Sequence, residues 1–172
     1  MRMNNDLEQR FNAQITLEFE ASMVYRQLAI EMDVQDLTGA ASWLRHQADE
    51  EIVHANKFID HVADRDNHPR IGQINAPQVA ADSMKAAFEA ALAHEQKVSA
   101  AIRDLVRAAE SEGDLDSRPL LNWFLSEQIE EESTVSEILG RIELTADDGP
   151  GLLRLDEDLA QRPTATTEDT GA

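Results

Sequence analysis

The chain of 172 residues contains no cysteine, few aromatic residues and no long apolar run. The lack of cysteine excludes disulfide frameworks, thiolate metal sites and cysteine nucleophiles. No apolar segment approaches the roughly 20 residues that a membrane-spanning helix needs, and the polar residues 1–10 do not resemble a signal peptide. We therefore expect a cytoplasmic protein with no membrane partner.

Basic residues are also scarce: 15 lysines and arginines stand against 34 aspartates and glutamates, which gives a formal net charge of −19. Such a field repels the phosphate backbone of nucleic acids and concentrates cations, so a nucleic-acid partner is disfavoured. The charge fits either a well-solvated surface or a protein that gathers cations. Charge alone does not separate these two interpretations.

Alanine is abundant in the chain, and alanine, leucine, glutamate and glutamine all form helices readily. Glycine and proline fall between stretches with helical periodicity rather than inside them. The periodicity predicts four long helices, at about residues 6–34, 40–66, 82–111 and 119–145. A break at Gly149-Pro150-Gly151 precedes a short amphipathic helix at about 152–162, and residues 163–172 are expected to form a disordered tail.

The lengths of the connections predict the topology. The links between helices one and two and between helices three and four are short, so each pair should form an antiparallel hairpin. A helix of about 27 residues is roughly 40 Å long, and the 15-residue link 67–81 can span roughly 50 Å when extended. The middle link can therefore cross the bundle. We expect an all-α four-helix bundle in which helices two and three run parallel.

One glutamate interrupts the apolar stripe near the middle of each long helix: Glu18, Glu51, Glu95 and Glu131. Because the midpoints of equally long helices lie at one height in a bundle, these carboxylates should converge in the core. Burying an unpaired carboxylate is unfavourable by several kcal/mol. Two divalent cations, bridged by some of the carboxylates, would offset the repulsion among the four.

His54 lies three residues after Glu51 and so shares a helix face with it. Glu-x-x-His on a bundle helix is an established ligand pair of di-iron and di-manganese carboxylate proteins. The motif alone is weak, but three other helices supply a glutamate at the matching height. A ligand set of mostly oxygen with one imidazole suits iron or manganese better than softer metals.

Each of these residues also has an ordinary structural interpretation. A single glutamate on an apolar stripe more often lies at a helix edge, with its head in water, than binds metal. His54 taken alone would more often be a surface or hydrogen-bonded histidine, and Tyr25 and Trp123 would more often be core residues than redox groups. The four matched glutamates and His54 together reverse those odds.

The segments around these residues resemble the ligand stretches of bacterial non-haem ferritins. They are Leu17-Glu18, Trp43-Leu44-Arg45, Asp49 to His54, His94-Glu95-Gln96 and Trp123 to Glu132. The resemblance covers about residues 6–160 and extends to the spacing between the motifs. It implies a ferritin-like domain over residues 1–162 that assembles into a hollow shell of twenty-four subunits. It also implies that the shell oxidises Fe(II) with dioxygen or hydrogen peroxide and stores a ferric mineral.

The same resemblance implies the ligands of two iron ions. Glu18 and His54 match terminal ligands of the first iron, and Glu51 matches the bridge between the two. Glu95 and Glu131 match ligands of the second iron. The five residues would together form a ferroxidase centre.

Residues around that centre have counterparts in the family as well. Glu50, Glu127 and Glu130 match the accessory iron site that bacterial ferritins have near the cavity. Gln128 resembles the glutamine beside the oxygen-binding position. Tyr25 matches the tyrosine next to the site.

Departures from related families narrow the interpretation. Bacterioferritins and most di-iron oxygenases carry a second Glu-x-x-His on the fourth helix, but here Thr134 stands three residues after Glu131, which disfavours that class. Bacterioferritin binds haem through a methionine directly after the bridging glutamate, where this chain has Ile52. Arg118 and Leu121 stand where animal ferritins place pore acids, so we assign no pore residues.

Two rival functions remain open on the sequence alone. A di-iron oxidase or rubrerythrin-like peroxidase would need a substrate pocket or a second histidine motif. A helical storage or scaffold protein could bind cations passively, without oxidising them.

Because Ile52 offers no thioether to a haem iron, we expect the purified protein to lack a stoichiometric Soret absorbance. The absorption spectrum of the native protein, expressed in cells supplied with a haem precursor, checks this expectation. Co-purification of one haem per pair of subunits would contradict it.

Overall fold

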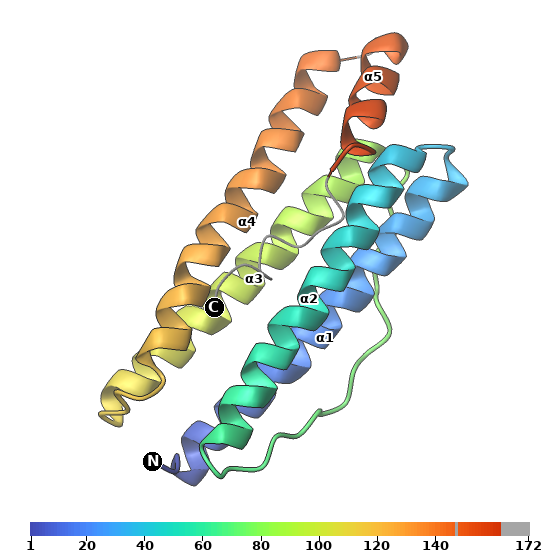
Figure 1. Ribbon diagram of the computed structural model, residues 1–172. Coiled ribbons are helices and arrows are strands. Elements are labelled where there is room, and N and C mark those ends of the chain that lie inside the picture. The colour runs from blue at the N-terminus through green and yellow to red at the C-terminus, as the bar shows by residue number, and fades with distance from the viewer. Residues whose placement is uncertain (147, 163–172) are drawn as a thin grey trace.

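The computed structural model describes residues 1–146 and 148–162, and the elements within these ranges are helices only. The four long helices are α1 (Asn5–Val34), α2 (Thr38–Asp64), α3 (Met84–Ser111) and α4 (Arg118–Thr145) (Figure 1). A short helix, α5 (Gly149–Leu159), contacts α2 and α4. The expected all-α bundle with a fifth helix is confirmed, whereas the expected tail at 163–172 lies outside the described residues.

The helices are joined in the expected order of short, long and short connections. Figure 1 shows α2 and α3 starting at the same end of the bundle and running parallel, with the segment between them passing along its full length. Backbone N–H groups of that segment donate to side chains of α1: Arg70 N donates to Asn12 Oδ1 at 2.9 Å, and Gly72 N donates to Thr16 Oγ1 at 2.8 Å. The long crossover is thus an ordered strap on α1.

Side chains at the helix starts satisfy backbone N–H groups that have no partner within the helix. Asn4 Oδ1 accepts from Leu7 N at 2.9 Å at the start of α1, and Ser83 Oγ accepts from Ala86 N at 3.2 Å at the start of α3. None of the helices in the described ranges has the length and apolar character that a membrane crossing requires.

The fifth helix begins at Gly149, three residues before the sequence-based expectation. Asp148 caps it by accepting from Gly151 N at 3.0 Å. Pro150 lies in the first turn, where a backbone N–H has no acceptor within the helix, so the N–H that proline lacks is not needed. The glycine–proline run is therefore the start of α5 rather than a break before it.

Two apolar clusters fill the bundle, one at each end. The cluster near α5 includes Leu28, Leu44 and Phe88, and the opposite cluster includes Phe58 and Phe124, whose rings stack with centroids 4.1 Å apart. Between the two clusters each long helix carries buried polar residues. Their side chains are Glu18, Ser22, Glu51, His54, Glu95, Gln128 and Glu131. These side chains form a polar layer at the mid-height of the bundle.

The end of the bundle is closed by a backbone contact between α5 and α2. The Asp156 carboxylate accepts from Gly39 N at 3.0 Å and from Ala40 N at 2.7 Å, and so caps the start of α2. The approach is so close that a Cβ on Gly39 would lie 1.8 Å from the backbone oxygen of Asp156. Only glycine fits at position 39 while α5 stays in place.

Gly39→Ala should therefore displace α5 and destabilise the protein by about 1–3 kcal/mol, the usual cost of overpacking. Gly140→Ala is the matched control, because a Cβ there meets nothing within 4 Å and alanine in a helix gains about 0.5–1 kcal/mol over glycine. Urea unfolding followed by helical circular dichroism measures both changes. Equal stability of the two variants would contradict the proposed contact.

Candidate metal centre

Each long helix contributes one carboxylate to the polar layer. Glu18 comes from α1, Glu51 from α2, Glu95 from α3 and Glu131 from α4, and none of these residues is more than 7% exposed. His54, 1% exposed, lies one turn after Glu51 on α2. Five ionisable side chains from four helices thus share one buried layer.

Within this layer two groups have the spacing that a single metal ion requires. Glu18, Glu51 and His54 form the first group, and His54, Glu127 and Glu131 form the second. In each group, one ligand atom per residue lies within 4.8 Å of the others. His54 belongs to both groups, so the imidazole stands between the Glu51 and Glu131 sides of the layer.

Neutral side chains hold the carboxylates of α1 and α2 in place. Gln14 Nε2 donates to Glu18 Oε1 at 2.7 Å, and Gln47 Nε2 donates to Glu51 Oε1 at 3.3 Å. The ring nitrogen Nδ1 of His54 lies 3.2 Å from Glu51 Oε2. Glu18 Oε2 is buried and, among the described residues, has no hydrogen-bond partner. A buried acceptor without a donor is unfavourable, and a cation in the layer would relieve it.

Glu95 is held from two sides. Tyr25 donates its hydroxyl to Glu95 Oε1, and Gln128 Nε2 donates to Glu95 Oε2 at 3.1 Å. The same amide lies 3.2 Å from Ser99 Oγ. Because these partners are neutral, they orient the carboxylate without cancelling its charge. Its capacity to bind a cation is retained.

Burial makes these carboxylates hard to ionise when no cation is present. Desolvation, followed by the charge of Glu51, raises the pKa of Glu18 to about 8 and that of Glu95 to about 7. Desolvation also raises the pKa of Glu131 well above its usual value, with the charge of Glu95 as the next cause. The pKa of the Tyr25 hydroxyl is raised mainly by burial and then by Glu95. A cation entering this layer must therefore displace protons.

The three acids expected to form an accessory site lie in different surroundings. Glu50 is buried, with Oε1 3.4 Å from His46 Nε2 and Oε2 2.5 Å from Arg162 Nη2. Glu127 is half-buried and close to His54, as described above, whereas Glu130 is exposed. Across residues 1–146 and 148–162, no close ligand group unites Glu50, Glu127 and Glu130.

Sequence reasoning missed several residues that shape the layer. Gln14 and Gln47 each stand four residues before a proposed ligand, a spacing that places them on the ligand's helix face and could have identified them. Ser99 stands four residues after Glu95 and could have been found in the same way. Arg162 is far from Glu50 in the sequence, and no local pattern connects the two.

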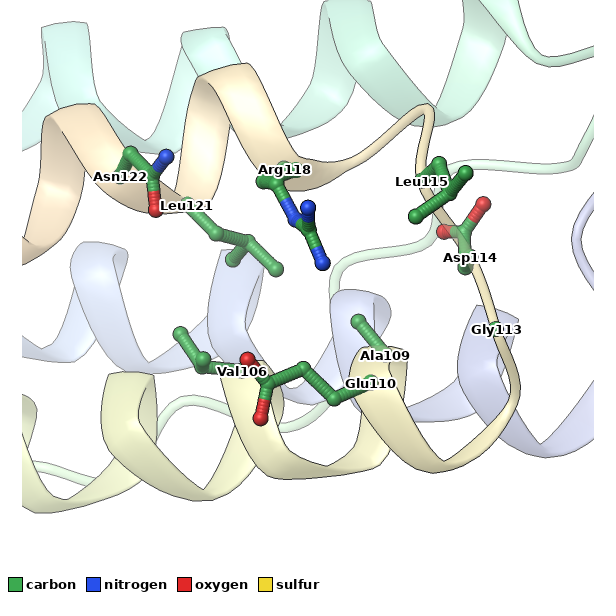
Figure 2. A pocket seen from close by; sticks show the side chains of 9 residues that line it. All are labelled: Val106, Ala109, Glu110, Gly113, Asp114, Leu115, Arg118, Leu121 and Asn122. Atoms are coloured by element: carbon green, nitrogen blue, oxygen red, sulfur yellow. The ribbon is translucent and has the colours of Figure 1, made fainter.

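A pocket of about 200 Å³ lies at the turn between α3 and α4, at the far end of the bundle from α5. Figure 2 shows Arg118 reaching into it from the start of α4, with Val106 and Ala109 on the opposite wall. Its lining residues include none of the carboxylates of the polar layer. The pocket therefore does not serve as a substrate chamber for that layer.

Comparisons with a family model, with related proteins and with solved structures all match ferritins. A family model described as the ferritin-like domain matches residues 8–145. The bacterial non-heme ferritin of Escherichia coli O157:H7 is 31% identical over 159 residues, which cover 92% of this chain and 96% of that protein. The bacterial non-heme ferritin of Staphylococcus haemolyticus is 32% identical, covering 93% and 96%. A solved open-pore ferritin of Archaeoglobus fulgidus superposes with a TM-score of 0.91 at 32% identity, covering 94% and 98%.

The raised pKa values predict how the stability of the apoprotein depends on pH. Folded Glu18 and Glu95 keep protons that the unfolded chain releases near pH 4.5. Their protonated forms therefore stabilise the fold fully below about pH 4.5, and this contribution is lost as the pH rises through about 7 to 8. We expect the midpoint of thermal unfolding of the metal-free protein to fall across that window.

Glu18→Gln should flatten this pH dependence, because glutamine is neutral at every pH in the window. Glu137→Gln, at an exposed position of α4, is the matched control and should keep the slope of the parent. Calorimetry at a series of pH values measures all three proteins. A parent whose midpoint rises between pH 5 and 8, or a Glu18→Gln variant with the full slope, would contradict the expectation.

Proposed function

This chain belongs to the ferritin family, and from that premise we propose that it stores iron. In this proposal Fe(II) is oxidised at the polar layer, and the ferric product is kept as a mineral inside a shell built from copies of the chain. The observation that carries the proposal is the buried set of four carboxylates, one from each helix, around His54. Such a layer is unfavourable without cations and well suited to two of them.

We propose that Glu51 is the ligand that bridges the two iron ions. Its charge is among the causes that raise the pKa values of Glu18, Glu95 and Glu131, so it faces carboxylates from all three other helices. A carboxylate in that place can bind one iron with each oxygen. We propose that Glu18 and His54 complete the first iron site, and that Glu95 and Glu131 complete the second.

The reaction needs two electrons delivered together. Two Fe(II) ions each lose one electron, and with two protons they reduce dioxygen to hydrogen peroxide. When hydrogen peroxide is the oxidant, it takes one electron from each of two Fe(II) ions and, with two protons, is reduced to two waters. The carboxyl protons displaced when iron binds at Glu18 and Glu95 are one local source. The side chains supply position, charge and open coordination sites.

Two neighbours of the centre have proposed supporting roles. Tyr25 stays protonated, because burial and the nearby carboxylates hold its pKa well above the usual value. Its hydroxyl therefore keeps donating to Glu95. Gln128 holds the other oxygen of the same carboxylate, beside the place where the oxidant would bind. We also propose that Glu50, Glu127 and Glu130 form an accessory iron site on the α2–α4 side of the layer.

A closed assembly of twenty-four subunits, in the cytoplasm, is part of the proposal. The proteins that this chain resembles over nearly its whole length are named ferritins. Large apolar side chains also stand exposed on α1 and on the crossover strap, and burying them against neighbouring subunits would be favourable. They are Ile30, Val34, Ile71 and Ile74.

The decisive test is the rate of the fast phase of Fe(II) oxidation by freshly prepared apoprotein. Glu51→Ala and His54→Ala should each slow it by roughly a hundredfold or more, because each removes a group that positions the reacting ions. Both variants should still fold and assemble, as sedimentation of the particle would show. The metal-free Glu51→Ala variant can even gain stability, since a buried carboxylate is removed.

Glu130→Ala is the matched control, because Glu130 is exposed and directly precedes Glu131 on α4. It should keep the fast phase and alter only later turnovers. Oxidation at the parent rate in Glu51→Ala would exclude the polar layer as the ferroxidase centre. Passive cation storage would then be the better account.

A further inference from the structure

Arg162, just after the end of α5, reaches back to the middle of α2. Its Nη2 lies 2.5 Å from Glu50 Oε2, and its Nη1 donates to Gln47 Oε1 at 2.9 Å. The guanidinium carbon is 4.6 Å from the centroid of the Trp43 ring. The Glu50 side chain is 7% exposed and that of Arg162 is 23% exposed. This is a fixed, largely buried ion pair rather than a loose surface contact.

The contact with Gln47 links Arg162 to the polar layer. Arginine has donors only, so the amide oxygen of Gln47 must face Arg162. The Gln47 amide nitrogen is thereby left to donate towards Glu51, whose Oε1 lies 3.3 Å away. The Arg162 guanidinium therefore contacts Glu50, a proposed accessory ligand. Through Gln47 it also orients the amide that donates to Glu51, the proposed bridge.

The position of Arg162 depends on the docking of α5. Asp156 ties α5 to the start of α2, and Asp158 pairs with Arg141 of α4 at 2.5 Å. Beside Arg162, a pocket of about 270 Å³ is bounded by residues of α2, α4 and α5, including Trp43 and Thr134. This pocket leaves room for the guanidinium to move away from Glu50 without undocking α5.

We propose that Arg162 is a built-in counter-cation for Glu50, which a metal ion must displace to bind there. The proposal rests on the accessory site proposed above and adds a regulating residue to it. A metal ion and Arg162 compete for the same carboxylate oxygen, so each weakens the binding of the other. Loading the accessory site then releases Arg162 from Trp43 and frees the Gln47 amide that faces Glu51.

Zinc is a suitable probe, because it is divalent and does not change oxidation state. In calorimetric titrations of the assembled apoprotein, the accessory sites are the class of bound Zn²⁺ that Glu50→Gln removes. Arg162→Gln should bind this class about tenfold more tightly, as expected when a competing charge within hydrogen-bond distance is removed. Arg162→Lys keeps the charge and should stay near the parent value.

Arg141→Gln is the matched control. It removes an equal charge and one exposed ion pair between α4 and α5, while Asp156 still holds α5 on the start of α2; in the structure Arg141 pairs with Asp158 rather than with Glu50. Arg141→Gln should bind the Glu50-dependent class of Zn²⁺ with the same affinity as the parent. Equal tightening in Arg141→Gln and Arg162→Gln would overturn the proposal, because it would trace the effect to α5 rather than to the guanidinium.

Trp43 reports directly on the release of Arg162. In a Trp123→Phe background Trp43 is the remaining tryptophan, so its emission can be followed alone. Filling the Glu50-dependent class with Zn²⁺ should change that emission when Arg162 is present. The change should be absent in Arg162→Gln, in which no cation lies over the ring.

Two further outcomes separate failure of this inference from failure of the accessory site. If Glu50→Gln removes a class of Zn²⁺ but Arg162→Gln leaves its affinity unchanged or weaker, Arg162 is not a competitor and only this inference is overturned. If Glu50→Gln removes no Zn²⁺ in either background, the accessory site itself is excluded. The role of Arg162 is then excluded with it.

Discussion

Four carboxylates in a layer that water barely reaches repel one another and resist ionisation, and the rest of the structure is organised around that difficulty. The apolar clusters on either side keep the helices together, so the layer cannot open to water. Without cations the layer keeps protons, as the raised pKa values of Glu18 and Glu95 show. Cations replace those protons when they bind. The same energetic imbalance thus limits the stability of the metal-free protein and would favour the binding of cations in the layer.

The neutral side chains around the layer explain how the carboxylates stay in position. Glutamines on α1, α2 and α4 each donate to one of the proposed ligands, and Tyr25 donates to Glu95. A lysine or arginine in these places would pair with the carboxylate and compete with iron. An apolar residue would leave the carboxylate free to rotate. Neutral donors avoid both consequences, because they hold geometry and leave the charge to the incoming ion.

Much of this arrangement was predictable from the sequence, because it depends on periodicity and length. The mid-helix glutamates and the Glu51–His54 spacing identify the layer, and the 67–81 link identifies the parallel pair of helices. Contacts between distant segments were not predictable. The pairing of Arg162 with Glu50 and the capping of α2 by Asp156 depend on where α5 docks. No local pattern encodes that docking.

The fifth helix therefore has more than a packing role. Gly39 lets α5 approach the backbone of α2, and this approach brings Arg162 to a carboxylate about three turns further along α2. The guanidinium of Arg162, just after α5, therefore lies beside a layer whose own hydrogen-bond donors are neutral. The positive charge of Arg162 is thus separated from Glu51 by one side chain, that of Gln47. A short chain of polar contacts consequently connects the docked α5 with the polar layer.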